Sequence, residues 1–247
     1  MYAGKSNALG TAHATGGSIS LISGFGTEST SGSIIIRTLN AGTAGVSGEL
    51  MLSTGTTSSG ASGDISIGTG TASTGDGGDI SIVVGDGNVL DGGHIYMYAG
   101  KSNADGTKHA TGGSISLISG YGTESTSGSI IIRTLNAGTK GVSGELMFST
   151  GTTSCGASGD ISIGTGTASL GDGGDISIVV GDGNVLDGGH IYMYAGKSNA
   201  DGTKHATGGS ISLISGYGTK STSGSIIIRT LNACLLYTSD AADEHGC

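Results

Sequence analysis

The chain repeats itself at two nested intervals, and this repetition constrains its fold more than any single motif does. The pentapeptide MYAGK at residues 1–5 returns at 97–101 and again at 193–197, so the outer period is 96 residues. Comparison of residues 1–96 with 97–192 finds seven differences, among them Phe25/Tyr121, Leu52/Phe148 and Thr74/Leu170. Copying of this unit has therefore been recent or actively maintained.

A second period appears inside the 96-residue unit when its glycines are aligned. Each module carries an aliphatic residue or methionine at its third and fifth positions, as Ile19 and Leu21 show. This alternation with period two predicts one short strand per module. The six modules are 15, 16, 15, 15, 15 and 20 residues long and begin at Gly17, Gly32, Gly48, Gly63, Gly78 and Gly93.

The module length predicts how these strands are arranged. A five-residue strand with two apolar side chains is not stable alone, so each module is expected to lay its strand beside that of its neighbour. The predicted fold class is therefore all-β: a β-solenoid of about 15-residue coils nested in a 96-residue repeat. Glycines at the first and eighth positions are expected to form the corners, because glycine reaches positive φ without strain. The absence of proline fits a stack in which nearly every N–H is a ladder donor.

The solenoid is predicted to span residues 1–233, with copies at 1–96 and 97–192 and a partial copy at 193–233. This repeat region resembles β-solenoid fibre proteins in general and no specific family.

Residues 234–247 break the repeat pattern. The stretch CLLYTSDAADE at 234–244 resembles the translation of a transposase adapter used in sequencing libraries. That resemblance implies that the tail is a sequencing artefact and that the natural chain is longer; Met1, which falls in mid-coil, supports the same expectation.

The composition excludes several classes of protein. Glycine occurs 52 times without a strict three-residue period and proline is absent, which excludes collagen. A disordered Gly/Ser/Thr-rich linker is the main alternative, but the aliphatic residues recur at fixed intervals, which favours an ordered chain. The formal net charge of −9 argues against nucleic-acid binding. No apolar run is long enough to predict a membrane span, and the three cysteines form no disulfide framework.

Acidic residues raise the possibility of a metal site. The Asp76-Gly-Gly-Asp79 turn resembles the Gly/Asp turns of calcium-binding β-roll repeats, and stacking is expected to bring Asp76 near Asp91. The same stacking aligns one residue per coil at about 4.8 Å spacing. This column contains Glu49, Asp64, Asp79 and His94. Calcium binding and hydrated surface carboxylates are both open; we favour the second and expect neither a bound metal nor a cofactor.

Catalysis is not expected. The histidines have no neighbouring nucleophile or carboxylate that would define one asymmetric pocket, so we predict that the chain is not an enzyme. Those considered as general bases are His94, His109, His190 and His205. An ice-binding face is a further alternative, since Thr54-Gly-Thr56 and Thr69-Gly-Thr71 fall in adjacent coils, but the next coils do not continue the array.

Apolar and aromatic residues also occupy the outward positions of the predicted strands. We call these six residues the outward stripe: Ile22, Ile35, Met51, Val83, Tyr96 and Tyr98. Such a stripe could form a second buried layer inside the coil or make lateral contacts with another solenoid. An exposed apolar stripe on strands favours association, so we prefer lateral contact.

These features predict a structural protein that forms an extracellular β-solenoid filament or surface fibre by self-association. The alternative is a monomeric binding solenoid, either ice-binding or an adhesin stalk. Serine- and threonine-rich corners could carry O-linked glycans, while no Asn-x-Ser/Thr acceptor is present. Six coils at about 4.8 Å each predict an axial repeat of about 29 Å. The 20-residue module is expected to bulge outward between Asn103 and Thr111, exposing Lys108 and His109.

Overall fold

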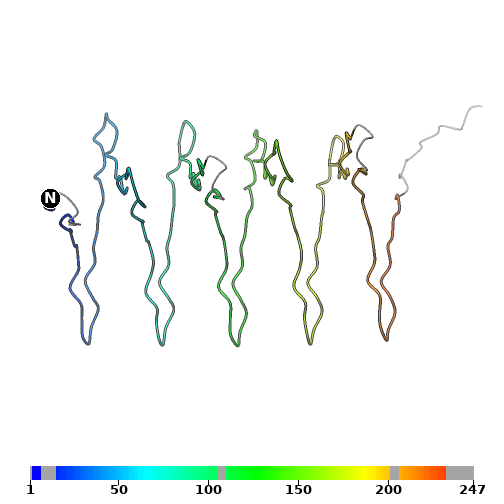
Figure 1. Cartoon of the computed structure of the whole chain (residues 1–247), viewed down its shortest axis with the longest axis horizontal. Helices are drawn as coiled ribbons and strands as arrows, with labels where there is room; N and C mark the ends of the chain where they lie inside the picture. Colours follow the sequence, from blue (N-terminus) through cyan, green and yellow to red (C-terminus); the bar gives the residue numbers. More distant parts are fainter. Residues whose placement is uncertain (1, 7–14, 105–109, 201–205, 232–247) are drawn as a thin grey trace, which may run out of the picture. The chain divides into compact units, whose positions relative to one another are not determined.

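The computed structural model of the chain describes residues 2–6, 15–104, 110–200 and 206–231. Within these ranges there is no α-helix and no β-strand, and the chain consists of extended segments connected by bends and loops. Figure 1 accordingly draws the described chain as a plain tube, without coiled ribbons or arrows. The end of the predicted repeat region, at residue 233, and the tail at 234–247 lie outside the described ranges.

The predicted all-β solenoid is wrong for the described residues. A strand exists only where its N–H and C=O groups pair with a neighbouring strand, and no such ladder joins the segments of successive modules. The hydrogen bonds that do form between backbone groups connect the two ends of individual loops. The alternation of apolar residues predicted one paired strand per module, and the segments at these positions are extended but unpaired.

One loop type recurs in all three copies of the repeat. The N–H of Gly32 donates to the carbonyl oxygen of Gly24 at 2.8 Å, and inside the loop the N–H of Gly26 donates to Ser31 Oγ at 3.2 Å. The same backbone bond links Gly128 to Gly120 at 2.8 Å and Gly224 to Gly216 at 2.9 Å. A backbone bond and a serine hydroxyl together close this loop.

Other module boundaries close in related ways. Gly93 N–H donates to Gly85 O at 3.1 Å, and the equivalent Gly189 bond to Gly181 measures 3.0 Å. In a different module the Thr38 hydroxyl donates to Gly48 O at 3.0 Å. The longer loop of the 20-residue module is closed by Gly113 N–H and Gly100 O at 2.7 Å. The first glycine of a module therefore lies at the base of a loop, instead of at the corner of a stacked coil.

Bends fall inside these loops at regular positions. In the first copy they occur at residues 27–29, 43–45, 58–60, 73–75 and 88–90; 96 residues later four of these bends recur, and a turn at 139–140 replaces the bend at 43–45. Gly60 adopts a φ of 100° and Gly156, its counterpart, a φ of 101°. A residue with a Cβ would be strained at that φ, so this bend requires glycine.

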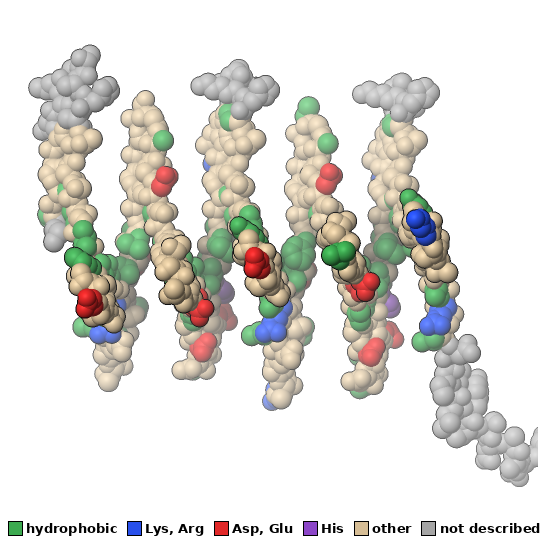
Figure 2. Space-filling view, turned by 90° about the horizontal axis from the view of Figure 1, so that it is seen from below, with side chains coloured by type: hydrophobic (Ala, Val, Ile, Leu, Met, Phe, Trp, Pro, Cys, Tyr) green, Lys and Arg blue, Asp and Glu red, His purple; other side chains and the backbone are tan. Residues whose placement is uncertain are grey.

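The described residues contain no hydrophobic core. None of their hydrophobic side chains is buried, and Ile19, Ile34 and Ile65, which occupy the third position of their modules, are between 48% and 56% exposed. Figure 2 shows patches of hydrophobic side chains at several places on the visible face. The apolar side chains at the third and fifth module positions therefore form no buried layer, because each extended segment lacks a partner that would cover it.

Contacts divide the chain into two units, Met1–Ile130 and Ile131–Cys247. The first unit contains the Gly24–Gly32 and Gly85–Gly93 loops, and the second contains their counterparts at Gly216–Gly224 and Gly181–Gly189. Each unit is therefore built from the same kinds of loop. The described residues include no helix that could cross a membrane.

The bend at residues 88–90 provides a test of this loop structure. A Cβ placed on Gly87 would overlap the carbonyl oxygens of Leu90 and Asp91, whereas a Cβ on Gly85 would meet nothing within 4 Å. We expect Gly87→Ala to open the loop and weaken the Gly93–Gly85 hydrogen bond. Loss of a bond of about 1 kcal/mol corresponds to roughly fivefold faster exchange of the Gly93 amide, measured by NMR.

Gly85→Ala is the matched control, and the Gly189 amide of the unmodified second copy is the internal reference. Both should keep their exchange rates. Equal acceleration in the two variants would show that the loop is not closed as described.

Candidate functional site

The outward stripe is the candidate functional site, because its side chains combine apolar character with high exposure. Its six members, Ile22, Ile35, Met51, Val83, Tyr96 and Tyr98, are between 70% and 85% exposed. Nothing in the described part of the chain covers them. Each of the six side chains is thus available for contact with another molecule, but the stacking of modules that would align them in one continuous stripe does not occur.

The aromatic part of the stripe has a defined local geometry. Residues two apart on an extended segment point to the same side. Accordingly the rings of Tyr96 and Tyr98 stack, with centroids 6.1 Å apart and planes inclined by 15°. His94 joins them from the other end, with its ring centroid 5.7 Å from that of Tyr96 and an inclination of 49°. We call these three residues the aromatic ladder.

The second copy of the repeat reproduces the ladder. Tyr192 and Tyr194 stack at 6.2 Å with an inclination of 14°, and His190 lies 5.7 Å from Tyr192 at 49°. The first ladder lies in the unit Met1–Ile130 and the second in Ile131–Cys247. The chain therefore carries the same aromatic surface at two places separated by one repeat.

Sequence reasoning placed Tyr96 and Tyr98 in the stripe but assigned His94 to the acidic column. The alternation in His94-Ile-Tyr-Met-Tyr98 was a sufficient signal, because it places the three rings on one side. Ile95 and Met97 occupy the other side and are 53% and 66% exposed. This five-residue segment therefore presents an aromatic face and an aliphatic face, both uncovered.

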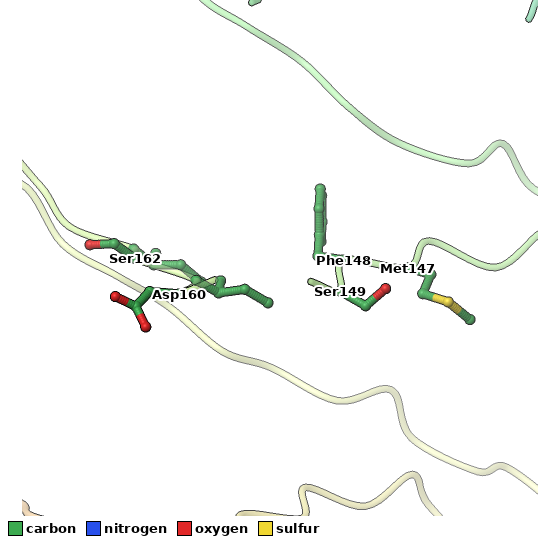
Figure 3. Close-up of a pocket in the computed structure, with 7 residues that line it drawn as sticks. Met147, Phe148, Ser149, Asp160 and Ser162 are labelled. Atoms are coloured by element: carbon green, nitrogen blue, oxygen red, sulfur yellow. The ribbon is translucent and has the colours of Figure 1, made fainter. Parts of the chain in front are cut away.

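An open hollow lies between two successive extended segments of the second unit (Figure 3). Met147, Phe148 and Ser149 lie on one segment, and Asp160 and Ser162 on the next. The hollow has a volume of about 520 Å³, but Phe148 is 66% exposed within it. A small-molecule site covers most of its ligand. This hollow is better described as the gap between two uncovered apolar segments.

The predicted column of acidic residues does not assemble. Among the described residues no three His, Cys, Asp or Glu side chains lie close enough together to hold a metal ion. The expected alignment of Glu49, Asp64, Asp79 and His94 depended on strands stacked at the spacing of a sheet, and that stacking does not occur. The same reason removes the expected approach of Asp76 to Asp91.

The remaining candidate residues have different local surroundings. His94 and His190 belong to the two aromatic ladders, while His109 and His205 lie outside the described residues. Thr69, which belongs to the Thr-Gly-Thr motif considered for ice binding, lies at the base of a loop. A Cβ added to Gly78 would lie 3.1 Å from the Cβ of Thr69. The predicted bulge from Asn103 to Thr111 falls within the loop closed by Gly100 and Gly113, but its Lys108 lies outside the described ranges.

Comparison with protein-family models, with curated proteins and with solved structures finds no match to this chain.

The stacked rings predict a spectroscopic signature. Replacing Tyr98 and Tyr194 by leucine should remove the tyrosine–tyrosine stack from both ladders, a contact worth about 0.5–1.5 kcal/mol. The near-UV circular dichroism of coupled tyrosines should then disappear. Tyr121→Leu with Tyr217→Leu is the matched control, since these side chains are 84% and 83% exposed. An equal change in the control pair would contradict the stacked geometry.

Because the carboxylates are scattered, we expect calcium to leave the structure and stability of the chain unchanged. With no cluster of three ligands in the described residues, adding millimolar calcium and then removing it with EDTA should leave the far-UV circular dichroism and the melting profile unchanged. A reversible, calcium-dependent gain of ordered structure would contradict this expectation.

Proposed function

We propose that this protein is a structural protein whose copies associate laterally into an extracellular filament or surface fibre. The observation that carries the proposal is the absence of any buried hydrophobic side chain among the described residues. Apolar surface of this extent is unfavourable in water and is usually covered by another molecule. The proposed contacts are made by exposed apolar side chains, among them the residues of the outward stripe, with the aromatic ladders as the most ordered part of this surface.

Repetition supports self-association over binding of a dissimilar partner. Near-identical copies display the same apolar and aromatic side chains at a constant sequence interval, as Tyr96 and Tyr192 illustrate, both 70% exposed. Two such chains can make the same contact at each repeat. Once one contact has formed, the next becomes intramolecular, so weak individual contacts combine into strong association.

Charge sets the conditions for this association. The chain carries a formal net charge of −9, so copies repel one another at low ionic strength. Salt screens charges that lie more than about 10 Å apart at 0.1 M, while the hydrophobic contribution persists. Association through the stripe should therefore strengthen as salt is added.

The proposed extracellular location and O-linked glycosylation follow from the proposal that the protein forms a fibre. Fibres of this kind act mechanically outside the cell by providing length, stiffness or adhesion. Several bends expose serine residues, among them Ser29, Ser58 and Ser73. The hydroxyl groups of these serines offer acceptors for O-linked glycans. Mass spectrometry of native material would identify such glycans.

The test is to remove one member of the stripe from every copy. We expect Ile35→Ser, Ile131→Ser and Ile227→Ser together to raise the critical concentration for association by about tenfold or more for each isoleucine replaced. Each replacement removes about 1.5–3 kcal/mol of burial energy, and 1.4 kcal/mol corresponds to about tenfold. Sedimentation velocity measures the critical concentration, and negative-stain electron microscopy shows whether filaments remain.

The matched control replaces Leu39, Leu135 and Leu231 by serine. These leucines are 73–85% exposed, compared with 74–78% for the three isoleucines, but they lie outside the stripe. Their replacement should change the critical concentration far less. A wild-type chain that stays monomeric at all concentrations and salt levels would overturn the proposal and favour a monomeric binding surface.

A further inference from the structure

We infer that the aromatic ladders are sites of oxidative tyrosine coupling, where a peroxide oxidant joins Tyr96 or Tyr98 covalently to a ladder tyrosine of a second copy. The inference rests on the proposed function, because two ladders must first be brought together by association. It adds a chemical modification that converts a reversible contact into a permanent one.

The phenol rings are open to an oxidant. Tyr96 is 70% exposed and Tyr98 is 85% exposed, and the corresponding Tyr192 and Tyr194 have the same values. A peroxidase acts on phenols that reach its haem edge or exchange electrons with a small mediator. Tyrosines in a packed core are closed to such reagents, whereas both ladders present their rings directly.

The stack favours radical transfer within a ladder. Its two rings lie 6.1 Å apart and are inclined by only 15°. Electrons exchange readily between phenol rings at this distance, so a radical formed on one tyrosine can pass to the other. Each ladder then offers two positions at which a radical can meet a partner ring.

The same stack disfavours coupling inside one ladder. The new bond joins ring carbons beside the hydroxyl groups, so the two rings must approach edge to edge. A direct carbon–carbon bond brings two ring centres closer together than the 6.1 Å and 6.2 Å that separate these rings, so both tyrosines of a ladder would have to move to couple with each other. A ring from a second copy can approach the free edges, which makes coupling between copies the expected outcome.

The reaction balances with hydrogen peroxide as the oxidant, activated by a haem peroxidase. Two tyrosines each lose the hydrogen atom of the phenol O–H, and one peroxide molecule takes up both hydrogens and becomes two molecules of water. The two phenoxyl radicals form one carbon–carbon bond between ring positions beside the oxygens. The hydrogen on each bonded carbon then moves as a proton to the phenolic oxygen, which restores both aromatic rings.

Two ladders per chain have a structural consequence. Tyr96 and Tyr98 lie in the first unit, and Tyr192 and Tyr194 in the second. A chain with a single ladder would offer coupling positions on one short segment only. A chain with two sites can be bonded to two neighbours, so coupling is expected to extend along an assembly.

The experiment uses the full chain, prepared as an equal mixture of unlabelled and ¹⁵N-labelled protein and first shown by light scattering to associate. Peroxidase and hydrogen peroxide are then added, and the product is run on a denaturing gel, digested and analysed by mass spectrometry. We expect covalent multimers and cross-linked ladder peptides lighter by two hydrogen atoms than the sum of their parts. Hybrid peptides, with one labelled and one unlabelled half, identify coupling between copies.

Two variants locate the reaction. Replacing Tyr96, Tyr98, Tyr192 and Tyr194 by phenylalanine keeps the rings but removes the phenols, so association should persist while most covalent multimers disappear. Tyr121→Phe with Tyr217→Phe removes phenols of similar exposure outside the ladders and should retain the multimers.

The outcomes separate this inference from the proposed function. An associated chain that yields no hybrid ladder peptides, or equal loss of multimers in both variants, overturns the coupling and leaves the filament standing. A chain that never associates before oxidation overturns both.

Discussion

The hydrogen bond at the base of each loop is the interaction on which the described structure depends. Gly32 N–H to Gly24 O and Gly93 N–H to Gly85 O each join residues eight positions apart and return the chain to nearly the same point. A bond of this kind contributes only about 0.5–1.5 kcal/mol, and here it is not reinforced by hydrogen bonds between neighbouring strands. Local form is therefore set loop by loop, and the extended segments between loops are left without partners.

Extended segments without a neighbouring strand expose both their backbone polar groups and their apolar side chains to water. Their N–H and C=O groups can be satisfied by water, so the exposed backbone is tolerable. Their side chains cannot, because both sides of a segment such as 94–98 carry apolar or aromatic groups, with Ile95 and Met97 opposite the ladder of Tyr96 and Tyr98. Further order must come from surfaces outside the single chain, which is the physical basis for proposing self-association.

Local features were predictable from the sequence to a useful degree. The two periods recur as loops and bends at intervals of 96 residues. The strands predicted from alternation are absent, although Tyr96 and Tyr98 do place their rings side by side, as a spacing of two residues on an extended segment predicts. The pairing of those segments was not predictable from alternation, because a pattern of apolar residues reports which side of a segment is apolar and not which segment lies next to it. The predicted solenoid was therefore wrong, and so was the predicted acidic column of Glu49, Asp64 and Asp79.

The candidate site was also predictable only in part. Spacing alone assigned Tyr96 and Tyr98 to one side of their segment. The hollow beside Phe148 could not be predicted, because it depends on how two successive modules approach each other.

The differences between the repeat copies show which parts of the repeat vary in sequence and which are retained. Of the seven positions at which residues 1–96 and 97–192 differ, only Leu52/Phe148 falls in an alternating segment, and both residues are apolar. The others fall between those segments: Leu9/Asp105, Ala12/Lys108, Phe25/Tyr121, Ala44/Lys140, Ser59/Cys155 and Thr74/Leu170. Packing inside the described chain does not explain why the segments are retained, because their side chains are exposed there. The proposed lateral association would restrict the same side chains in each repeat and leave the loops free to vary, which is the pattern of differences that the copies show.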